Sequence, residues 1–203
     1  MRVKICGMTR LQDVQAAVEA GADALGFVFA PRSRRVLQPE LATELVRAVP
    51  AFVSRVGLFM DQDYETVRRI IDRVPLNLLQ FHGREDAAFC RRFGLPYVKA
   101  VAMGSGPSLE QAGEAFADAA ALLLDSHRSG EVGGTGRTFE WEGIPPLDLP
   151  VILAGGLTPA NVRQAVRQVR PWAVDVASGV EDAPGIKSME KMQTFISEAK
   201  REY

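Results

Sequence analysis

The chain has 203 residues, of which 47% are hydrophobic and 24% are charged, and its formal net charge at pH 7 is -1. These values predict one globular domain over residues 1–203 and exclude disorder as its main state. The near-neutral charge argues against a nucleic-acid or membrane-surface partner, and no apolar run is long enough to span a membrane. The first residues, MRVKICGMTR, lack the apolar stretch of a signal peptide, and two cysteines do not form a disulfide framework. We therefore expect a cytoplasmic protein.

Short apolar runs recur along the chain, each with the length of a buried parallel strand. In chain order they are Val3–Cys6, Ala24–Phe29, Val53–Phe59, Asn77–Phe81, Tyr97–Val101, Ala121–Leu124, Val151–Ala154 and Ala173–Val176. The segments between these runs have the periodicity and the end signals of helices, such as Pro39 at a first helical position and Ser108 as an N-cap. They are Leu11–Ala20, Pro39–Val49, Asp63–Val74, Glu85–Phe93, Ser108–Phe116, Thr158–Val169 and Ser188–Lys200, with a short eighth helix starting at Glu140–Trp141.

Strands that alternate with helices predict a parallel sheet with helical crossovers. Eight such units in about 200 residues fit an α/β fold of the single (β/α)8 TIM-barrel type. A doubly wound open sheet is the structural alternative. The one long irregular stretch, residues 126–138, has the length of a functional loop.

In a (β/α)8 barrel the active site lies at the carboxyl ends of the strands, so the residues that end each run are the candidates. Cys6 ends the first run, where it is either a small buried hydrophobe or a reactive thiol. Asp125 follows the sixth run and precedes no helix that it could cap, which favours a functional role. His82, close to Gln80, either lines the site or turns the chain into the next helix. Asp175 lies at the eighth run.

Two glycine-containing loops follow the last two strands. Gly155 and Gly156 follow the seventh strand, and Ser178 and Gly179 follow the eighth. Glycine lets backbone N–H groups approach an anion, a helix amino terminus adds a favourable dipole, and these two loops commonly hold phosphate in such barrels. The sequence therefore predicts a phosphate site there. It contains no P-loop, no nucleophile elbow and no zinc-binding motif.

These blocks resemble the phosphoribosylanthranilate isomerase family of tryptophan biosynthesis. The matching segments are Lys4-Ile-Cys-Gly-Met-Thr, Gly26-Phe-Val-Phe with Ser33-Arg-Arg, Val56-Gly-Leu-Phe, Leu79-Gln-Phe-His-Gly, Leu124-Asp-Ser, Gly133-Gly-Thr-Gly with Phe139-Glu-Trp, Ala154-Gly-Gly-Leu-Thr-Pro-Ala-Asn-Val, and Val174-Asp-Val-Ala-Ser-Gly-Val-Glu with Pro184-Gly-Ile-Lys. The first and last of these are the most specific together.

The resemblance implies an Amadori rearrangement of N-(5-phosphoribosyl)anthranilate, a phosphosugar, to an aminoketose. It implies Cys6 as general base and Asp125 as general acid, with Arg35 on the anthranilate carboxylate. Cysteine acts as a base only as thiolate, so its pKa should be lowered. Gln80, His82 and Asp175 would contact substrate, and Gly155, Gly156, Ser178 and Gly179 would hold its phosphate. The resemblance implies no cofactor and no metal, and it leaves open whether the protein is a monomer or a homodimer.

Other functions remain as alternatives. The related isomerase of the histidine pathway uses two aspartates, and Cys6 argues against it. Indole-glycerol-phosphate synthase would need a catalytic lysine, for which Lys99 is the candidate. A phosphosugar-binding barrel without activity would not need both Cys6 and Asp125.

Overall fold

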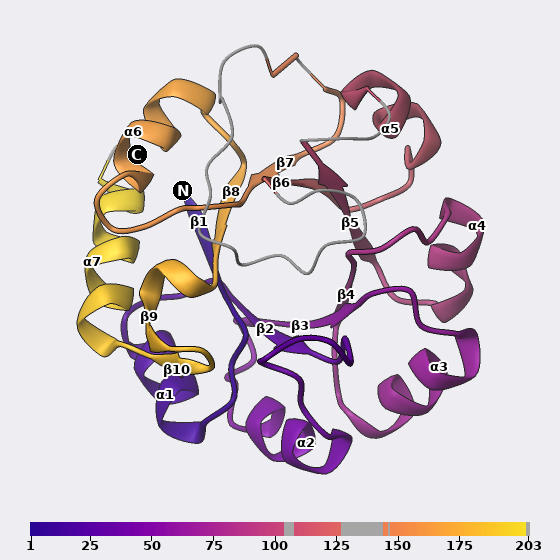
Figure 1. Ribbon diagram of the computed structural model, residues 1–203, viewed down its shortest axis with the longest axis horizontal. Helices are drawn as coiled ribbons and strands as arrows, with labels where there is room; N and C mark the ends of the chain where they lie inside the picture. Colours follow the sequence, from indigo (N-terminus) through magenta and orange to yellow (C-terminus); the bar gives the residue numbers. More distant parts are fainter. Residues whose placement is uncertain (104–107, 127–143, 146, 202–203) are drawn as a thin grey trace.

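The computed structural model describes residues 1–103, 108–126, 144–145 and 147–201. Eight parallel strands close into a barrel in the order of the chain, and helices surround it (Figure 1). The strands are β1 (Arg2–Cys6), β2 (Ala24–Val28), β3 (Ser54–Phe59), β4 (Leu78–Phe81), β5 (Tyr97–Ala102), β6 (Ala121–Asp125), β7 (Val151–Leu153) and β8 (Ala173–Val176). The pairing of β1 with both β2 and β8 closes the ring, so the (β/α)8 prediction is confirmed and the open-sheet alternative is wrong.

The helices lie where the alternating pattern predicts them. They are α1 (Leu11–Glu19), α2 (Pro39–Arg47), α3 (Tyr64–Arg73), α4 (Ala87–Cys90), α5 (Leu109–Ala115), α6 (Val162–Val169) and α7 (Met189–Lys200). Pro39 occupies a first-turn position of α2, and Ser108 caps α5 in a capping box with Gln111. The predicted helix at Glu140–Trp141 and most of the irregular stretch 126–138 lie outside the described residues. No helix within the described ranges is long and apolar enough to cross a membrane.

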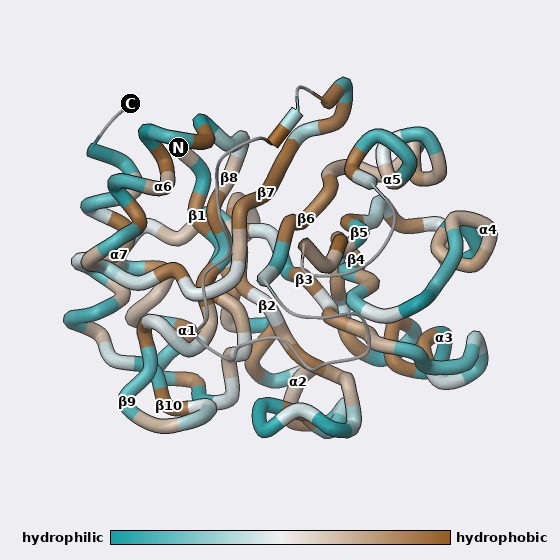
Figure 2. The backbone as a smooth tube through the Cα atoms, turned by 45° about the horizontal axis from the view of Figure 1, so that its top comes forward, coloured by the Kyte–Doolittle hydropathy of each residue, from teal (hydrophilic) through white to brown (hydrophobic). Residues whose placement is uncertain are grey.

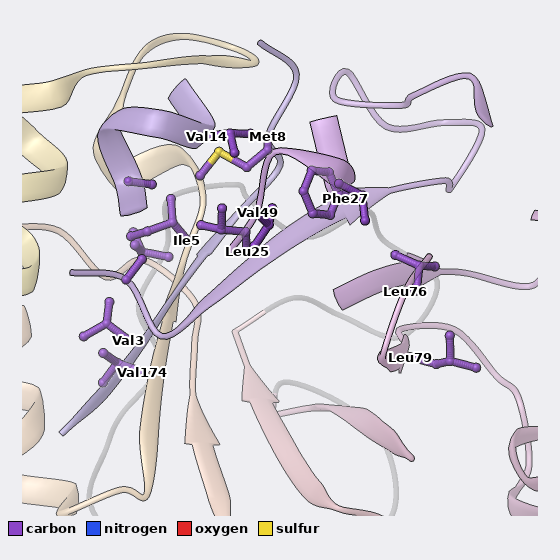
Figure 3. Close-up of a cluster of buried hydrophobic side chains, with 14 of the residues drawn as sticks. Val3, Ile5, Met8, Val14, Leu25, Phe27, Val49, Leu76, Leu79 and Val174 are labelled. Carbon is purple, nitrogen blue, oxygen red and sulfur yellow. The ribbon is translucent and has the colours of Figure 1, made fainter. Parts of the chain in front are cut away.

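The strands place alternate side chains on the two faces of the barrel wall, because side chains of a strand alternate with a period of two. On β1, Val3 and Ile5 point outward and are buried against the helices with Val14 of α1 (Figure 3). Their neighbours Lys4 and Cys6 therefore point into the barrel. Figure 2 shows the same organisation along the backbone, with hydrophobic strands in the middle and hydrophilic positions on the outer helices.

Two predicted helices begin later than expected. Glu85 precedes α4, whose cap is Asp86 accepting from Phe89 N at 2.7 Å, and the segment ends in a 3-10 turn at Arg91–Phe93. Thr158 does not cap α6; residues 158–161 form a turn, and the helix begins at Val162.

A small hairpin between β8 and α7 was not predicted. After a 3-10 turn at Ser178–Val180, strands β9 (Glu181–Ala183) and β10 (Ile186–Lys187) pair antiparallel around Gly185, whose φ is +80°. Lys187 N donates to Asp13 Oδ2 at 3.1 Å, and Thr9 Oγ1 donates to Gly185 O. These contacts fasten the hairpin to the chain around the start of α1, beside which it lies in Figure 1.

Candidate active site

One cavity at the carboxyl ends of the strands contains all six predicted catalytic and substrate-contacting side chains. They are Cys6, Arg35, Gln80, His82, Asp125 and Asp175. Apolar residues, among them Val28, Leu58 and Met60, complete its wall. Parallel strands all end at the same mouth of the barrel, and this is why residues so far apart in the sequence meet here.

Cys6 lies beside a buried ion pair. Lys4 and Asp175 face each other in the β1–β8 register, with Lys4 Nζ 2.8 Å from Asp175 Oδ1 and both side chains less than 10% exposed. The positive charge of Lys4 also favours the ionised form of the Cys6 thiol. Opposite Cys6 on β2 stands Gly26, where any Cβ would press on the Cys6 sulfur, so glycine leaves room for the thiol.

The electrostatics of Cys6 differ from the expected lowering. Burial raises the pKa of the Cys6 thiol, and Asp175 adds to the rise, while Lys4 and Lys187 oppose it. Burial disfavours the Lys4 ammonium, but Asp175 and Cys6 outweigh burial and raise the Lys4 pKa to about 12. The site without substrate therefore favours the protonated thiol, and the expectation of a lowered Cys6 pKa is wrong for this state.

Asp125 ends β6 and faces His82. His82 Nε2 lies 3.4 Å from Asp125 Oδ2, and Gln80 Nε2 lies 3.0 Å from His82 Nδ1. If the Gln80 amide donates to Nδ1, the neutral ring carries its proton on Nε2, the atom that faces Asp125. His82 thus lies between Gln80 and Asp125, and it lines the site instead of only turning the chain.

Lys99 points away from this cavity. Its ammonium lies between β5 and the surrounding layer, 3.2 Å from Glu85 Oε2, and donates to the carbonyl of Gly83. Glu85 accepts from Gly83 N at 2.9 Å and from Asp61 N at 2.7 Å. The Lys99–Glu85 pair therefore fixes the loop that follows β4, and Lys99 is not placed to act as the catalytic lysine of a synthase.

Arg35 reaches the cavity from the segment after β2, and a carboxylate holds its guanidinium. Arg35 Nε and Nη2 donate to the two oxygens of Glu181 at 2.7 and 2.6 Å. Lys187 Nζ donates to Glu181 Oε1 at 2.8 Å. Beneath the arginine stem lies Gly7, with φ +82°, where a Cβ would overlap Arg35 Cδ.

The two glycine loops are neighbours but do not line the described cavity. A Cβ on Gly179 would overlap the carbonyl of Leu157, so the loop after β8 packs directly on the loop after β7. Gly155 and Gly156 both have positive φ, and the Asn161 amide donates to Gly156 O at 3.0 Å. The sequence predicts that a helix begins directly after Gly156. This is wrong, because α6 begins only at Val162.

Sequence reasoning missed three charged residues around the site: Lys4, Glu181 and Lys187. All three are buried, with side chains 7%, 5% and 0% exposed. Lys4 carried a signal, since a lysine inside the apolar run Val3–Cys6 shares the face of Cys6 two residues later. Glu181 and Lys187 lie in the unpredicted hairpin, and their signal was that each ends a segment that matches the family, Val174–Glu181 and Pro184–Lys187.

A thiol, a carboxylate and an arginine at the carboxyl mouth of a closed eight-stranded barrel define a (β/α)8-barrel enzyme site suited to acid–base chemistry on an anionic substrate. The family model described as N-(5'phosphoribosyl)anthranilate (PRA) isomerase matches residues 3–198. The N-(5'-phosphoribosyl)anthranilate isomerase of Thiobacillus denitrificans is 54% identical over 201 residues, 98% of each chain.

Solved structures of phosphoribosyl anthranilate isomerases are similar to this chain over nearly its whole length. The phosphoribosyl anthranilate isomerase from Thermotoga maritima superposes with a TM-score of 0.90 at 40% identity, covering 99% of each chain. Another phosphoribosyl anthranilate isomerase, solved with reduced 1-(o-carboxyphenylamino)-1-deoxyribulose 5-phosphate, has a TM-score of 0.87 at 40% identity, again over 99% of each chain. The chain belongs to the phosphoribosylanthranilate isomerase family, the isomerases of tryptophan biosynthesis.

Proposed function

We propose that Cys6 and Asp125 are the general base and the general acid that convert N-(5-phosphoribosyl)anthranilate to 1-(2-carboxyphenylamino)-1-deoxyribulose 5-phosphate. The observation that carries this assignment is their position: a thiol from β1 and a carboxylate from β6 line one cavity. A sugar bound between them has one face toward each group. General acid–base catalysis needs this kind of reach on both sides of the reacting atoms.

The proton transfers balance without any other reactant. Asp125 donates a proton to the furanose ring oxygen as its bond to C1 breaks, and the nitrogen lone pair forms a protonated Schiff base. Cys6 as thiolate then removes the proton from C2, the electron pair of that C–H bond forms the C1–C2 double bond, and the C1–N double-bond pair returns to nitrogen to give an enolamine. Tautomerisation moves the hydroxyl proton of C2 to C1, which yields the ketone, and return of the proton from Cys6 to Asp125 through solvent restores both groups.

Arg35 is proposed to bind the anthranilate carboxylate, a planar anion that a guanidinium can hold with two hydrogen bonds. Gly155, Gly156, Ser178 and Gly179 are proposed to hold the phosphate through backbone N–H groups. Positive φ at Gly155 and Gly156 supports this, because such turns expose consecutive amides. Gln80, His82 and Asp175 are proposed to contact the sugar from the floor and wall of the cavity.

Steady-state kinetics with freshly prepared substrate test the assignment. Cys6→Ser should fold and bind substrate but lose about 10²–10⁴-fold in kcat, because a serine hydroxyl is a poor base at neutral pH. Asp125→Asn should lose turnover with little change in KM and should lose the basic limb of the kcat profile. Near-normal kcat in Cys6→Ser, or an unchanged basic limb in Asp125→Asn, would show that another group transfers the proton.

We also propose that the protein is a homodimer that associates through the amino-terminal mouth of the barrel. A crystal structure of the Thermotoga maritima family member concerns engineered monomers of a dimeric isomerase. In this chain Phe52 is fully exposed beside a cavity of about 290 Å³ whose rim includes Trp172, which is 46% exposed. A projecting ring and a hollow on one face suit the self-complementary contact of a two-fold dimer.

Light scattering over a range of protein concentrations tests the dimer. The wild-type mass should be that of two chains, and Phe52→Glu should shift it to one chain without loss of secondary structure. A monomeric wild type, or an unchanged Phe52→Glu dimer, contradicts this interface. We propose a cytoplasmic location on separate grounds: Cys6 and Cys90 are both free, and reducing compartments such as the cytoplasm keep thiols in this state.

A further inference from the structure

The Arg35 guanidinium already has one of its edges occupied. Glu181 takes the edge formed by Nε and Nη2 with two short hydrogen bonds. A guanidinium has five N–H groups, so three remain, two on Nη1 and one on Nη2. Arg35 lines the site cavity, whereas Glu181 does not. Glu181 thus lies behind the arginine, away from the space where a ligand would bind.

Glu181 is itself fixed from several directions. Lys187 Nζ and Gly185 N both donate to its Oε1, at 2.8 and 3.3 Å. Lys187 also donates to Ala177 O at 3.0 Å, and its side chain is completely buried. The hairpin that carries these residues is held by Asp13 on α1. A carboxylate with this many fixed donors holds the guanidinium in one orientation.

The charges around Glu181 also leave the edge of the cavity positive. Two cations, Arg35 and Lys187, share one carboxylate, which leaves one positive charge in excess at the edge of the cavity. Burial opposes ionisation of Glu181, but Arg35 and Lys187 outweigh burial and lower its pKa, so the carboxylate is charged at neutral pH. The excess charge is available to an incoming anion, while the buried Lys187 stays paired.

We propose that Glu181 is a positioning residue that sets the specificity for a substrate bearing an aryl carboxylate. It fixes Arg35 so that its remaining edge, formed by Nη1 and Nη2, receives the substrate carboxylate in the plane of the guanidinium. Arg35 then binds two carboxylates at once, one from the protein and one from the substrate. This inference rests on the proposed role of Arg35 and extends it to a residue that does not touch substrate.

The test compares two ligands that differ only in the carboxylate. Reductive amination of ribose 5-phosphate with anthranilate gives a reduced product analogue, and the same reaction with aniline gives its counterpart without the carboxyl group. Calorimetric binding of both is measured for the wild type, for Glu181→Gln and for Arg35→Lys. The matched control is Asp182→Asn, which removes the same charge from the next residue, whose carboxylate faces Lys191 on the surface.

Glu181→Gln should weaken the carboxylate analogue by about tenfold, a partial loss of a charge-assisted pair, and leave the other ligand within about twofold. Asp182→Asn should change neither. Equal weakening of both ligands in Glu181→Gln would make its role merely structural and overturn the inference. If Glu181→Gln binds both ligands as the wild type does, while Arg35→Lys no longer prefers the ligand with the carboxylate, the role of Glu181 is overturned and the role of Arg35 stands. If Arg35→Lys still prefers the ligand with the carboxylate as strongly as the wild type does, the proposed roles of both Arg35 and Glu181 are wrong.

Glu181→Gln leaves the buried Lys187 without its anion and could unfold the protein for that reason alone. The double variant Glu181→Gln with Lys187→Met removes both buried charges and keeps the volume of the lysine stem. Arg35 still loses its protein carboxylate in this variant, so binding of the same two ligands tests the same inference. Equal weakening of both ligands, or unchanged binding of both, would overturn it here too. Circular dichroism before each titration establishes that the variant is folded.

Discussion

Replacing Lys4 with methionine should raise the pKa of Cys6 and destabilise the protein. The change removes the cation from the Lys4–Asp175 pair and leaves a buried carboxylate beside the thiol. A unit charge about 4 Å from a thiolate is worth roughly 4 kcal/mol at an effective dielectric constant of about 20, or about 3 pKa units. Water that enters beside the shorter side chain reduces this effect, and we expect a rise of about 1–2 units.

The matched control is the double variant Lys4→Met with Asp175→Asn. It removes both charges, so the pKa of Cys6 should return to within about half a unit of the wild-type value. Stability should follow the same order. A buried ion pair that loses one partner costs about 3–5 kcal/mol, whereas removal of both partners restores most of this loss.

The assay is the pH dependence of alkylation by iodoacetamide, which reacts with the thiolate. The measurements use a Cys90→Ala background. Cys90 is buried in the outer layer, where burial raises the pKa of its thiol to about 12, so its removal does not touch the site. Two results would refute the electrostatic coupling of Lys4 to Cys6. One is alkylation curves that superimpose for Lys4→Met and the wild type; the other is a double variant in which the apparent pKa of Cys6 has shifted as far as in Lys4→Met.

Three further predictions concern the supports of the site. Gly7→Ala should raise KM several-fold with little change in kcat, because its Cβ would displace Arg35 Cδ; an unchanged KM in steady-state kinetics counts against this packing. Lys99→Met should lower the free energy of unfolding in urea by about 3–5 kcal/mol, since Glu85 loses its buried partner, and a loss below 1 kcal/mol would contradict a buried pair. Because the Glu181 pKa is lowered from 4.5, the stability it contributes is present above about pH 4.5 and disappears as the pH falls further. Acid unfolding of Glu181→Gln should be less steep than that of the wild type, and identical curves would exclude this contribution.

The barrel strands could be predicted closely because each is an apolar run buried on both faces. The sixth run was expected at Ala121–Leu124 and the strand is Ala121–Asp125; the eighth was expected and found at Ala173–Val176. Helix starts were less certain. At α6 the Thr158-Pro159 pair has the pattern of a cap and first turn, but Asn161 binds Thr158 N and Gly156 O with its side chain and delays the helix.

The hairpin could not be predicted for a physical reason. Its two strands, Glu181–Ala183 and Ile186–Lys187, have three and two residues and no alternating apolar pattern. The hairpin is held by contacts to Asp13 and Thr9 near the other end of the chain. Cys6, Gln80, His82, Asp125 and Asp175 could be predicted from their places at or near the ends of the apolar runs, and Arg35 from the resemblance. The ion pair of Lys4 with Asp175 depends instead on which strands become neighbours when the barrel closes.

The raised pKa of Cys6 has a mechanistic consequence that can be measured. Before ring opening, burial disfavours the thiolate of Cys6 and the Asp175 carboxylate adds to this, while the cations Lys4 and Lys187 oppose it only in part. Ring opening places a protonated Schiff base, a full positive charge, next to C2. That charge stabilises a neighbouring thiolate and acidifies the C2 proton, so Cys6 should lose its proton to solvent most easily after Asp125 has donated its own. The acidic limb of the kcat profile reports the bound enzyme, and its apparent pKa should therefore lie below the pKa that alkylation reports for free Cys6. If the two values coincide, substrate does not tune the thiol, and the raised pKa must be overcome by the protein alone.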